Sequence, residues 1–141
     1  MKLKQLVDIK IGLPLERKKA EILSDIKISY KMLTLKSFAN RDNFNQLTSE
    51  EFIAKSPINS QFLTKENDVI VRLRTPNDAT FINKDHTGLI VPALMAIIHN
   101  NCPNILNSLY LTYWLNSDDT QKQYIKNTQG TSIPMIKIAD S

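Results

Sequence analysis

The stretch DVIVRLRTPND, residues 68–78, combines a strand signal with an abrupt end to it. Its first half is apolar and β-branched, which is typical of a buried strand. A period of two places Arg72 and Arg74 on one face and Val71 and Leu73 on the other. The proline that follows lacks an N–H, and the Asn-Asp pair after it favours a turn. The sequence therefore predicts two arginines side by side where a strand opens into a polar loop.

The overall composition is that of an ordinary globular domain. The chain has 141 residues, of which 42% are hydrophobic and 23% charged, so one domain with a real core is expected. The net charge is +4, which permits a polyanionic partner without requiring one. A single cysteine, Cys102, excludes an internal disulfide and suits a reducing compartment. The start, Met1–Gln5, lacks the apolar core of a signal peptide, so we expect a cytoplasmic protein.

The first two thirds of the chain predict mainly strands. Ile26–Leu35 and Asp68–Leu73 are strand-like, and Lys36–Asn45 is a polar loop. Leu89–Ile98 fits a buried strand broken at Pro92 and is too short to span a membrane. Thr48-Ser49-Glu50-Glu51 matches a capping box and predicts a short helix, with a turn at Ser56–Asn59.

The last third changes to helical patterns. Pro103 can open a helix that runs through the apolar Ile105–Leu115. A second helix is expected over Asp119–Asn127, with a stop at Gly130, and a short strand over Ile133–Ile138. This order predicts an α+β fold: a single compact domain with a small mixed sheet and helices concentrated in the C-terminal third.

The sequence offers little for catalysis or for cofactors. His86, His99 and Cys102 are the only soft metal ligands, fewer than a structural zinc site needs, so we expect no metal. Asp8, Glu16 and Lys18 resemble a metal-nuclease pattern that is short and common by chance. No glycine-rich nucleotide-binding motif and no nucleophile elbow is present, so we expect neither a bound cofactor nor an active site.

A polyanion-binding surface is the remaining candidate. Basic residues fall mainly in predicted loops and at strand ends, interleaved with hydroxyl and amide side chains. Cations give affinity for phosphates, whereas guanidinium and amide groups can also read base edges. The alternative is a solvated polar surface. The basic residues are Arg17, Lys18, Lys19, Lys36, Arg41, Arg72, Arg74 and Lys84.

Four segments, in this order, resemble the target recognition domain of type I restriction-modification specificity subunits. Tyr30–Phe38 is similar to the family's strand and polar loop near the start of the domain. Asn67–Arg74 resembles its Gly-Asp-hydrophobic strand, with Asn67 in place of the usual glycine. Tyr110–Ser117 resembles a "YLxYxLNS" helix, and Gln129–Met135 an "xGTxxPxL" turn. The set covers most of the chain.

The resemblance implies a non-catalytic module that reads one half of a bipartite double-stranded DNA target. In that family, methylation and cleavage belong to partner methyltransferase (modification) and restriction subunits, which bring S-adenosylmethionine, Mg²⁺ and ATP. The expected DNA contacts lie on three loops next to strand ends. They are Lys36, Ser37, Asn40 and Arg41; Arg72, Arg74, Thr75, Asn77 and Asp78; and Thr131 and Ser132, near Gln129.

Two alternatives stay open for this surface and this chain. Arg72 and Arg74 could form an ion-paired strand face against Asp68, Asp78 or Asp85, and Thr131 and Ser132 could belong to a helix-ending turn. The chain departs from the family by ending at Ser141, with one domain over residues 1–141 and no spacer helix or second recognition domain. A truncated or stand-alone relative that acts as a protein-interaction module, through Ile105–Leu115, is therefore the second hypothesis.

Overall fold

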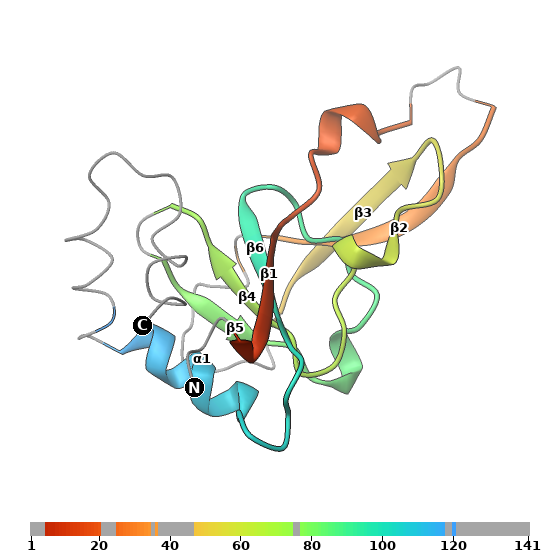
Figure 1. Cartoon of the computed structure of the whole chain (residues 1–141). Coiled ribbons are helices and arrows are strands. Elements are labelled where there is room, and N and C mark those ends of the chain that lie inside the picture. The colour runs from red at the N-terminus through yellow and green to blue at the C-terminus, as the bar shows by residue number, and fades with distance from the viewer. Residues whose placement is uncertain are drawn as a thin grey trace.

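A four-stranded antiparallel sheet forms the centre of the structure (Figure 1). The computed structural model describes residues 5–20, 25–34, 36, 47–74, 77–117 and 120. The sheet has the order β1-β6-β4-β5, and every neighbouring pair is antiparallel. Its strands are β1 (Val7–Ile11), β6 (Met95–Asn100), β4 (Val69–Arg72) and β5 (Ala79–Phe81).

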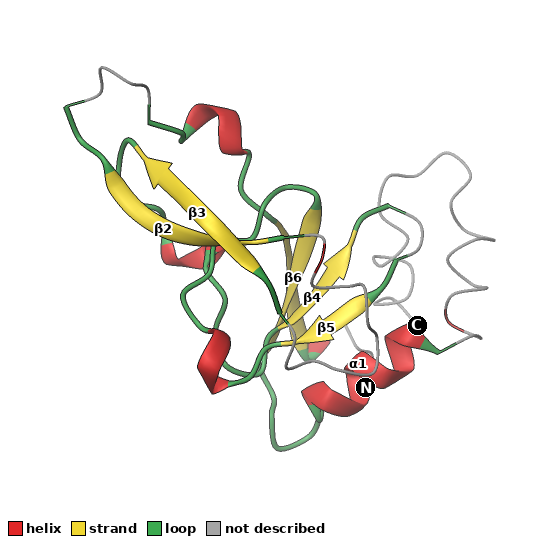
Figure 2. Ribbon diagram, turned by 180° about the vertical axis from the view of Figure 1, so that it is seen from behind, coloured by secondary structure: helices red, strands yellow, loops and turns green. Residues whose placement is uncertain are grey.

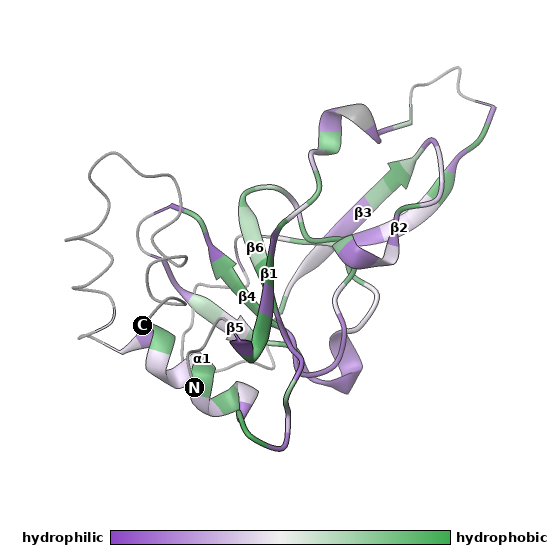
Figure 3. Cartoon of the chain, in the orientation of Figure 1, coloured by the Kyte–Doolittle hydropathy of each residue, from purple (hydrophilic) through white to green (hydrophobic). Residues whose placement is uncertain are grey.

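The predicted strand over Asp68–Leu73 is confirmed as β4, and it lies between β6 and β5. Val69, Ile70 and Val71 are completely buried, so both faces of β4 are covered. Complete burial of such side chains contributes about 1.5–3 kcal/mol each. Figure 3 shows the change from hydrophobic to hydrophilic residues at the end of this strand, where Arg72 lies.

A separate two-stranded sheet, β2–β3, extends from the central sheet (Figure 2). β2 (Ile28–Leu33) confirms the strand expected over Ile26–Leu35. The short helix expected at Thr48–Glu51 is wrong, because β3 (Ser49–Ala54) occupies this region. Pairing with β2 buries Phe52 and Ala54. The stabilisation from this burial outweighs the local preference of the capping-box residues for a helix.

Residues 89–92 connect the two sheets through backbone hydrogen bonds. Ile90 donates to the carbonyl of Lys31 at 2.8 Å and accepts from the N–H of Leu33 at 2.9 Å. The next residue, Val91, donates to Phe62 at 2.9 Å and accepts from Leu13 at 2.7 Å. The strand expected over Leu89–Ile98 is therefore only partly right, because β6 begins at Met95, after the break at Pro92.

Gly12 allows this connecting segment to approach closely. A Cβ atom at Gly12 would lie 2.0 Å from the carbonyl oxygen of Pro92, well inside van der Waals contact. Because the obstacle is backbone, no side chain can move aside to make room. Glycine is therefore needed where β1 passes Pro92.

One α-helix among the described residues, α1 (Ser108–Asn116), covers a face of the central sheet. Leu111 and Leu115 pack in one cluster with Val69 and Val71. The predicted start at Pro103 is wrong, because the Asn107 side chain caps the helix by accepting from the N–H of Tyr110 at 2.9 Å. The expected second helix, Gly130 stop and final strand lie outside the described residues.

These elements confirm the α+β fold class, with a helix in the last third of the chain. The expected mixed sheet is replaced by antiparallel pairing between all the described strands. Within the described part of the chain, no helix is long and apolar enough to cross a membrane.

The side chain of Asn116 fixes α1 to β5, the last strand in the order of the central sheet. Its Oδ1 accepts from the N–H of Ala79 at 2.7 Å, and its Nδ2 donates to the carbonyl of Ala79 at 2.9 Å. The amide thus satisfies both backbone groups of Ala79, as a further strand would. Ser117 then ends the helix, because its Oγ donates to the carbonyl of Trp114 at 2.7 Å.

Replacing Asn116 by alanine should lower the free energy of unfolding by about 2–3 kcal/mol, because two half-buried backbone groups lose their partners. Urea unfolding followed by circular dichroism measures this loss. Asn104→Ala, at an exposed turn, is the matched control and should unfold at the wild-type midpoint. An unchanged midpoint for Asn116→Ala would show that the two hydrogen bonds do not stabilise the fold.

Candidate nucleic-acid interface

Arg72 and Arg74 lie where β4 ends, as the sequence predicted. Val71 and Leu73 pack in the same hydrophobic cluster, so the predicted apolar face is confirmed. Arg72 is half-buried and stands opposite Met95 of β6, whereas Arg74 follows in a bend and is exposed. The Nε–H of Arg72 is buried and donates to no partner among the described residues.

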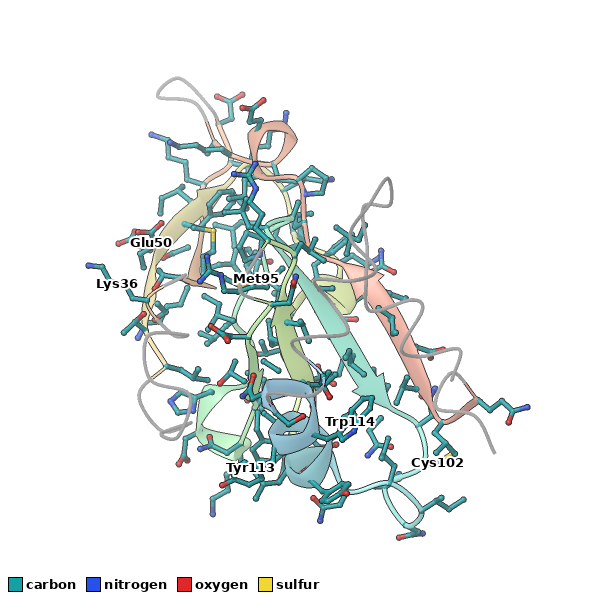
Figure 4. The ribbon with its side chains drawn as sticks, turned by 90° about the vertical axis from the view of Figure 1, so that its left-hand side faces the viewer. Lys36, Glu50, Met95, Cys102, Tyr113 and Trp114 are labelled. Carbon is teal, nitrogen blue, oxygen red and sulfur yellow. The ribbon has the colours of Figure 1, made fainter. Side chains whose placement is uncertain are left out.

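Lys36 reaches the same region from the β2–β3 sheet. It lines a pocket of about 320 Å³ together with Glu50, Leu94 and Met95. Figure 4 shows Lys36 and Glu50 on one side of this pocket, with Met95 further inside. Met95 is also the partner of Arg72 in the sheet, so it has a neighbour of each kind: Lys36 in the pocket and Arg72 in the register.

The turn before β6 is hydrogen-bonded to the residue that precedes Arg74. The N–H of Leu73 donates to the carbonyl of Leu94 at 3.1 Å, and Leu94 itself is exposed. We name the surface formed by Lys36, Arg72, Arg74 and Leu94 the basic rim. The basic residues of this surface come from segments that are more than thirty positions apart in the sequence.

Asn77 and Asp78 lie inside the domain rather than on the basic rim. Their exposed fractions are 3% and 5%. The Nδ2 of Asn77 donates to the carbonyl of Arg72 at 2.9 Å, and the carbonyl of Asp78 accepts from the N–H of Arg72 at the same distance. Both residues therefore hold the end of β4 and direct the chain that carries the arginines.

The other expected contact residues are not part of the described structure. They are Ser37, Asn40, Arg41, Thr75, Thr131 and Ser132, with Gln129 beside the last two.

The ion-paired alternative for the two arginines can be compared with the observed pairs. The Asp68 carboxylate interacts with His99, where Nδ1 lies 2.7 Å from Oδ1, and not with an arginine. Within the described ranges, neither Arg72 nor Arg74 forms an ion pair with Asp68, Asp78 or Asp85.

The sequence did not predict the pair of His99 and Asp68, which line a second pocket together with Asp8, Lys10 and Lys65. The pair joins residues 31 positions apart, so no local spacing could have revealed it. Glu16 and Lys18, the other members of the nuclease-like pattern, do not line this pocket. Among the residues described, no three histidine, cysteine or acidic side chains are grouped to hold a metal.

Two residues of the family-like segments have defined structural roles here. Asn67 has a φ of 72°, in the left-handed region that favours glycine, the residue usual at this position in the family. Asparagine tolerates this conformation better than other non-glycine residues. Asn116, in the "LNS" of the helix, forms the contact with β5.

Substituting Asn77 by alanine should lower the free energy of unfolding by about 1–2 kcal/mol, because the buried carbonyl of Arg72 loses a hydrogen bond. The urea midpoint, read from the fluorescence of Trp114, measures the effect. Asn104→Ala is again the control. If Asn77→Ala unfolds like the wild type but changes a DNA preference, Asn77 is a contact residue and not a structural one.

Comparisons with known proteins give one structural likeness to report. No protein-family model matches the chain, and no curated protein does. Among solved structures, the chain is similar to the HsdS subunit from Thermoanaerobacter tengcongensis, with 12% sequence identity and a TM-score of 0.47. The match covers 86% of this chain, which spans 30% of the HsdS chain.

Proposed function

We propose that this chain is a non-catalytic module that binds double-stranded DNA and reads one half of a bipartite site. The ordered set of four segments, from Tyr30–Phe38 to Gln129–Met135, carries this proposal. Support also comes from Asn67 and Asn116, which occupy positions where the family-like residue types have a clear structural use. Methylation and cleavage are assigned to partner methyltransferase and restriction subunits.

The basic rim is the proposed contact surface. Arg74 and Lys36 are exposed and can neutralise phosphates, while Arg72 is half-buried. A guanidinium can also donate two hydrogen bonds to the edge of a guanine. Thr75 and the loop residues Ser37, Asn40, Arg41, Thr131 and Ser132 complete the proposed contact set. Asn77 and Asp78 support it from within, because they hold the end of β4.

Charge reversal on the basic rim should weaken DNA binding. We expect Arg74→Glu and Lys36→Glu each to reduce affinity about tenfold at low salt, and to lower the slope of log K against log salt by about one. Fluorescence anisotropy with a randomised duplex pool, at low and moderate salt, measures the affinity. Sequencing the bound fraction then identifies any preferred half-site of roughly 3–5 base pairs.

Lys55→Glu is the matched control for these variants, because Lys55 is exposed and follows the opposite end of β3. It changes the net charge equally and should lose much less affinity. Equal losses in all three variants would mean that only net charge matters. Absence of binding by the wild type at low salt would exclude DNA reading by the chain alone.

A protein-interaction role is the second candidate, and the outer face of α1 favours it. Ile105, Leu109, Tyr110 and Tyr113 are large apolar or aromatic residues that are exposed on or just before this helix. Tyr110 is 68% exposed, and Figure 4 shows Tyr113 and Trp114 on neighbouring parts of the helix. Clustered exposed residues of this kind mark protein interaction sites more often than scattered ones do.

If this face binds a modification subunit, Ile105→Ser/Tyr110→Ser protein should lose most of the complex formed with that subunit. Light scattering coupled to size-exclusion chromatography measures complex formation. Ile26→Ser is the control, since Ile26 is an exposed apolar residue outside the helix. A complex that forms equally well with the double variant would exclude this face as the interface.

A further inference from the structure

We propose that the pocket formed by β1, β6 and the Ser60–Lys65 segment binds a phosphate group. The pocket has a volume of about 200 Å³. This is several times the roughly 30 Å³ that one water molecule occupies in the liquid, so a phosphate fits together with some of its water. Three neighbouring strands supply its polar side chains: β1 gives Asp8 and Lys10, β6 gives His99, and Asp68 precedes β4.

The imidazole of His99 is held in one orientation by a buried carboxylate. Asp68 is 1% exposed, and its Oδ1 accepts from the Nδ1 of His99 at 2.7 Å. Its Oδ2 accepts from the backbone N–H of Lys65 at 2.9 Å, so both carboxylate oxygens are occupied. An ionised carboxylate can only accept, so an ionised Asp68 requires the ring proton on Nδ1.

This geometry leaves the other ring nitrogen of His99 available for a ligand. The His99 side chain is 44% exposed and lines the pocket. When the ring is protonated, Nε2 donates to a phosphate oxygen; when it is neutral, Nε2 accepts from a protonated phosphate oxygen. In both states Asp68 keeps the ring in place. In the protonated state it compensates the positive charge of the ring only on the buried side.

Two ammonium groups in the pocket are held by neutral acceptors. Lys10 Nζ donates to Oε1 of Gln61 at 3.0 Å, and Lys65 Nζ donates to the carbonyl of Ser60 at 2.8 Å. Each ammonium has three donors, so two remain on each. In the described portion of the chain neither lysine is ion-paired, which leaves the charge of both unneutralised. Fixed ammonium groups with spare donors are suited to a phosphate.

Two carboxylates line the pocket, and of these Asp68 is buried against His99 whereas Asp8 is exposed and opposes this ligand. It lies on β1 directly opposite His99 in the sheet register, and its carboxylate is exposed. It therefore reduces the attraction for phosphate without removing it, because water screens exposed charges. Removing this charge should strengthen phosphate binding, which an anion site demands and a purely structural His–Asp pair does not.

The test uses the nitrogen resonances of the two histidines in the full chain. Inorganic phosphate should shift Nε2 of His99 in ¹⁵N NMR, relative to sodium chloride at the same ionic strength and pH. His86 lies outside the pocket, where its Nδ1 contacts Asn83, and serves as the internal reference. If His99 moves no more than His86 at tens of millimolar phosphate, the proposal is overturned.

Substitutions then assign the site to the pocket. We expect Lys10→Gln and Lys65→Gln each to weaken phosphate binding about tenfold, and Asp8→Asn to strengthen it several-fold. Lys55→Gln removes an exposed charge elsewhere and should bind phosphate like the wild type. Amide NMR spectra of each variant verify that it is folded. Wild-type affinity in folded Lys10→Gln and Lys65→Gln proteins would contradict the proposal.

A second titration, with a short DNA duplex, identifies the source of the phosphate. A shift of His99 with both probes assigns the site to the DNA backbone, and a shift with inorganic phosphate alone assigns it to a free phosphate. If DNA binds by anisotropy while His99 responds to neither probe, the pocket proposal fails and the DNA-binding proposal stands. If inorganic phosphate shifts the His99 resonance but no DNA binds, the pocket proposal stands and the DNA-binding proposal fails.

Discussion

The backbone of residues 89–92 is the constraint on which the rest of the structure depends. A segment that joins two strands usually lies at the surface, where water satisfies its polar groups. Here Ile90 and Val91 are completely buried, and their N–H and carbonyl groups bond to Lys31, Leu33, Phe62 and Leu13 instead. Because unpaired buried backbone groups are costly, the two sheets and the loop around Phe62 must come together at this segment.

The strands that sequence patterns predicted are those with long runs of β-branched and apolar residues. β2 and β4 have such runs and were placed within two residues of their ends. β5 has only three residues and was missed, because its strand character comes from pairing with β4 and from the side chain of Asn116. At β3, a local capping pattern predicted a helix, whereas burial of Phe52 against β2 decides for a strand.

Some residues of the candidate site could be predicted from the sequence and others could not, and the difference again has a physical cause. Cationic side chains after a predicted strand are exposed because burying an unpaired charge is expensive, so Arg74 and Lys36 could be placed from sequence. Short polar side chains can be either exposed or buried, so residue type alone does not predict their exposure. Asn77 and Asp78 have the residue types of an exposed turn, yet they are buried because they complete the hydrogen bonds at the end of β4. The contact between His99 and Asp68 depends on strand order, which no local pattern encodes.

The β2–β3 pair is closed at its open end by its own hydrogen bonds. Leu33 pairs with Ser49, the N–H of Thr34 donates to the carbonyl of Thr48, and the two threonine hydroxyls bond to each other. The ladder is thus anchored on both sides, independently of the identity of the residues that join Thr34 to Thr48. Because the entropy of loop closure depends only weakly on loop length, these hydrogen bonds define the end of the β2–β3 ladder more strongly than the length of the connection does.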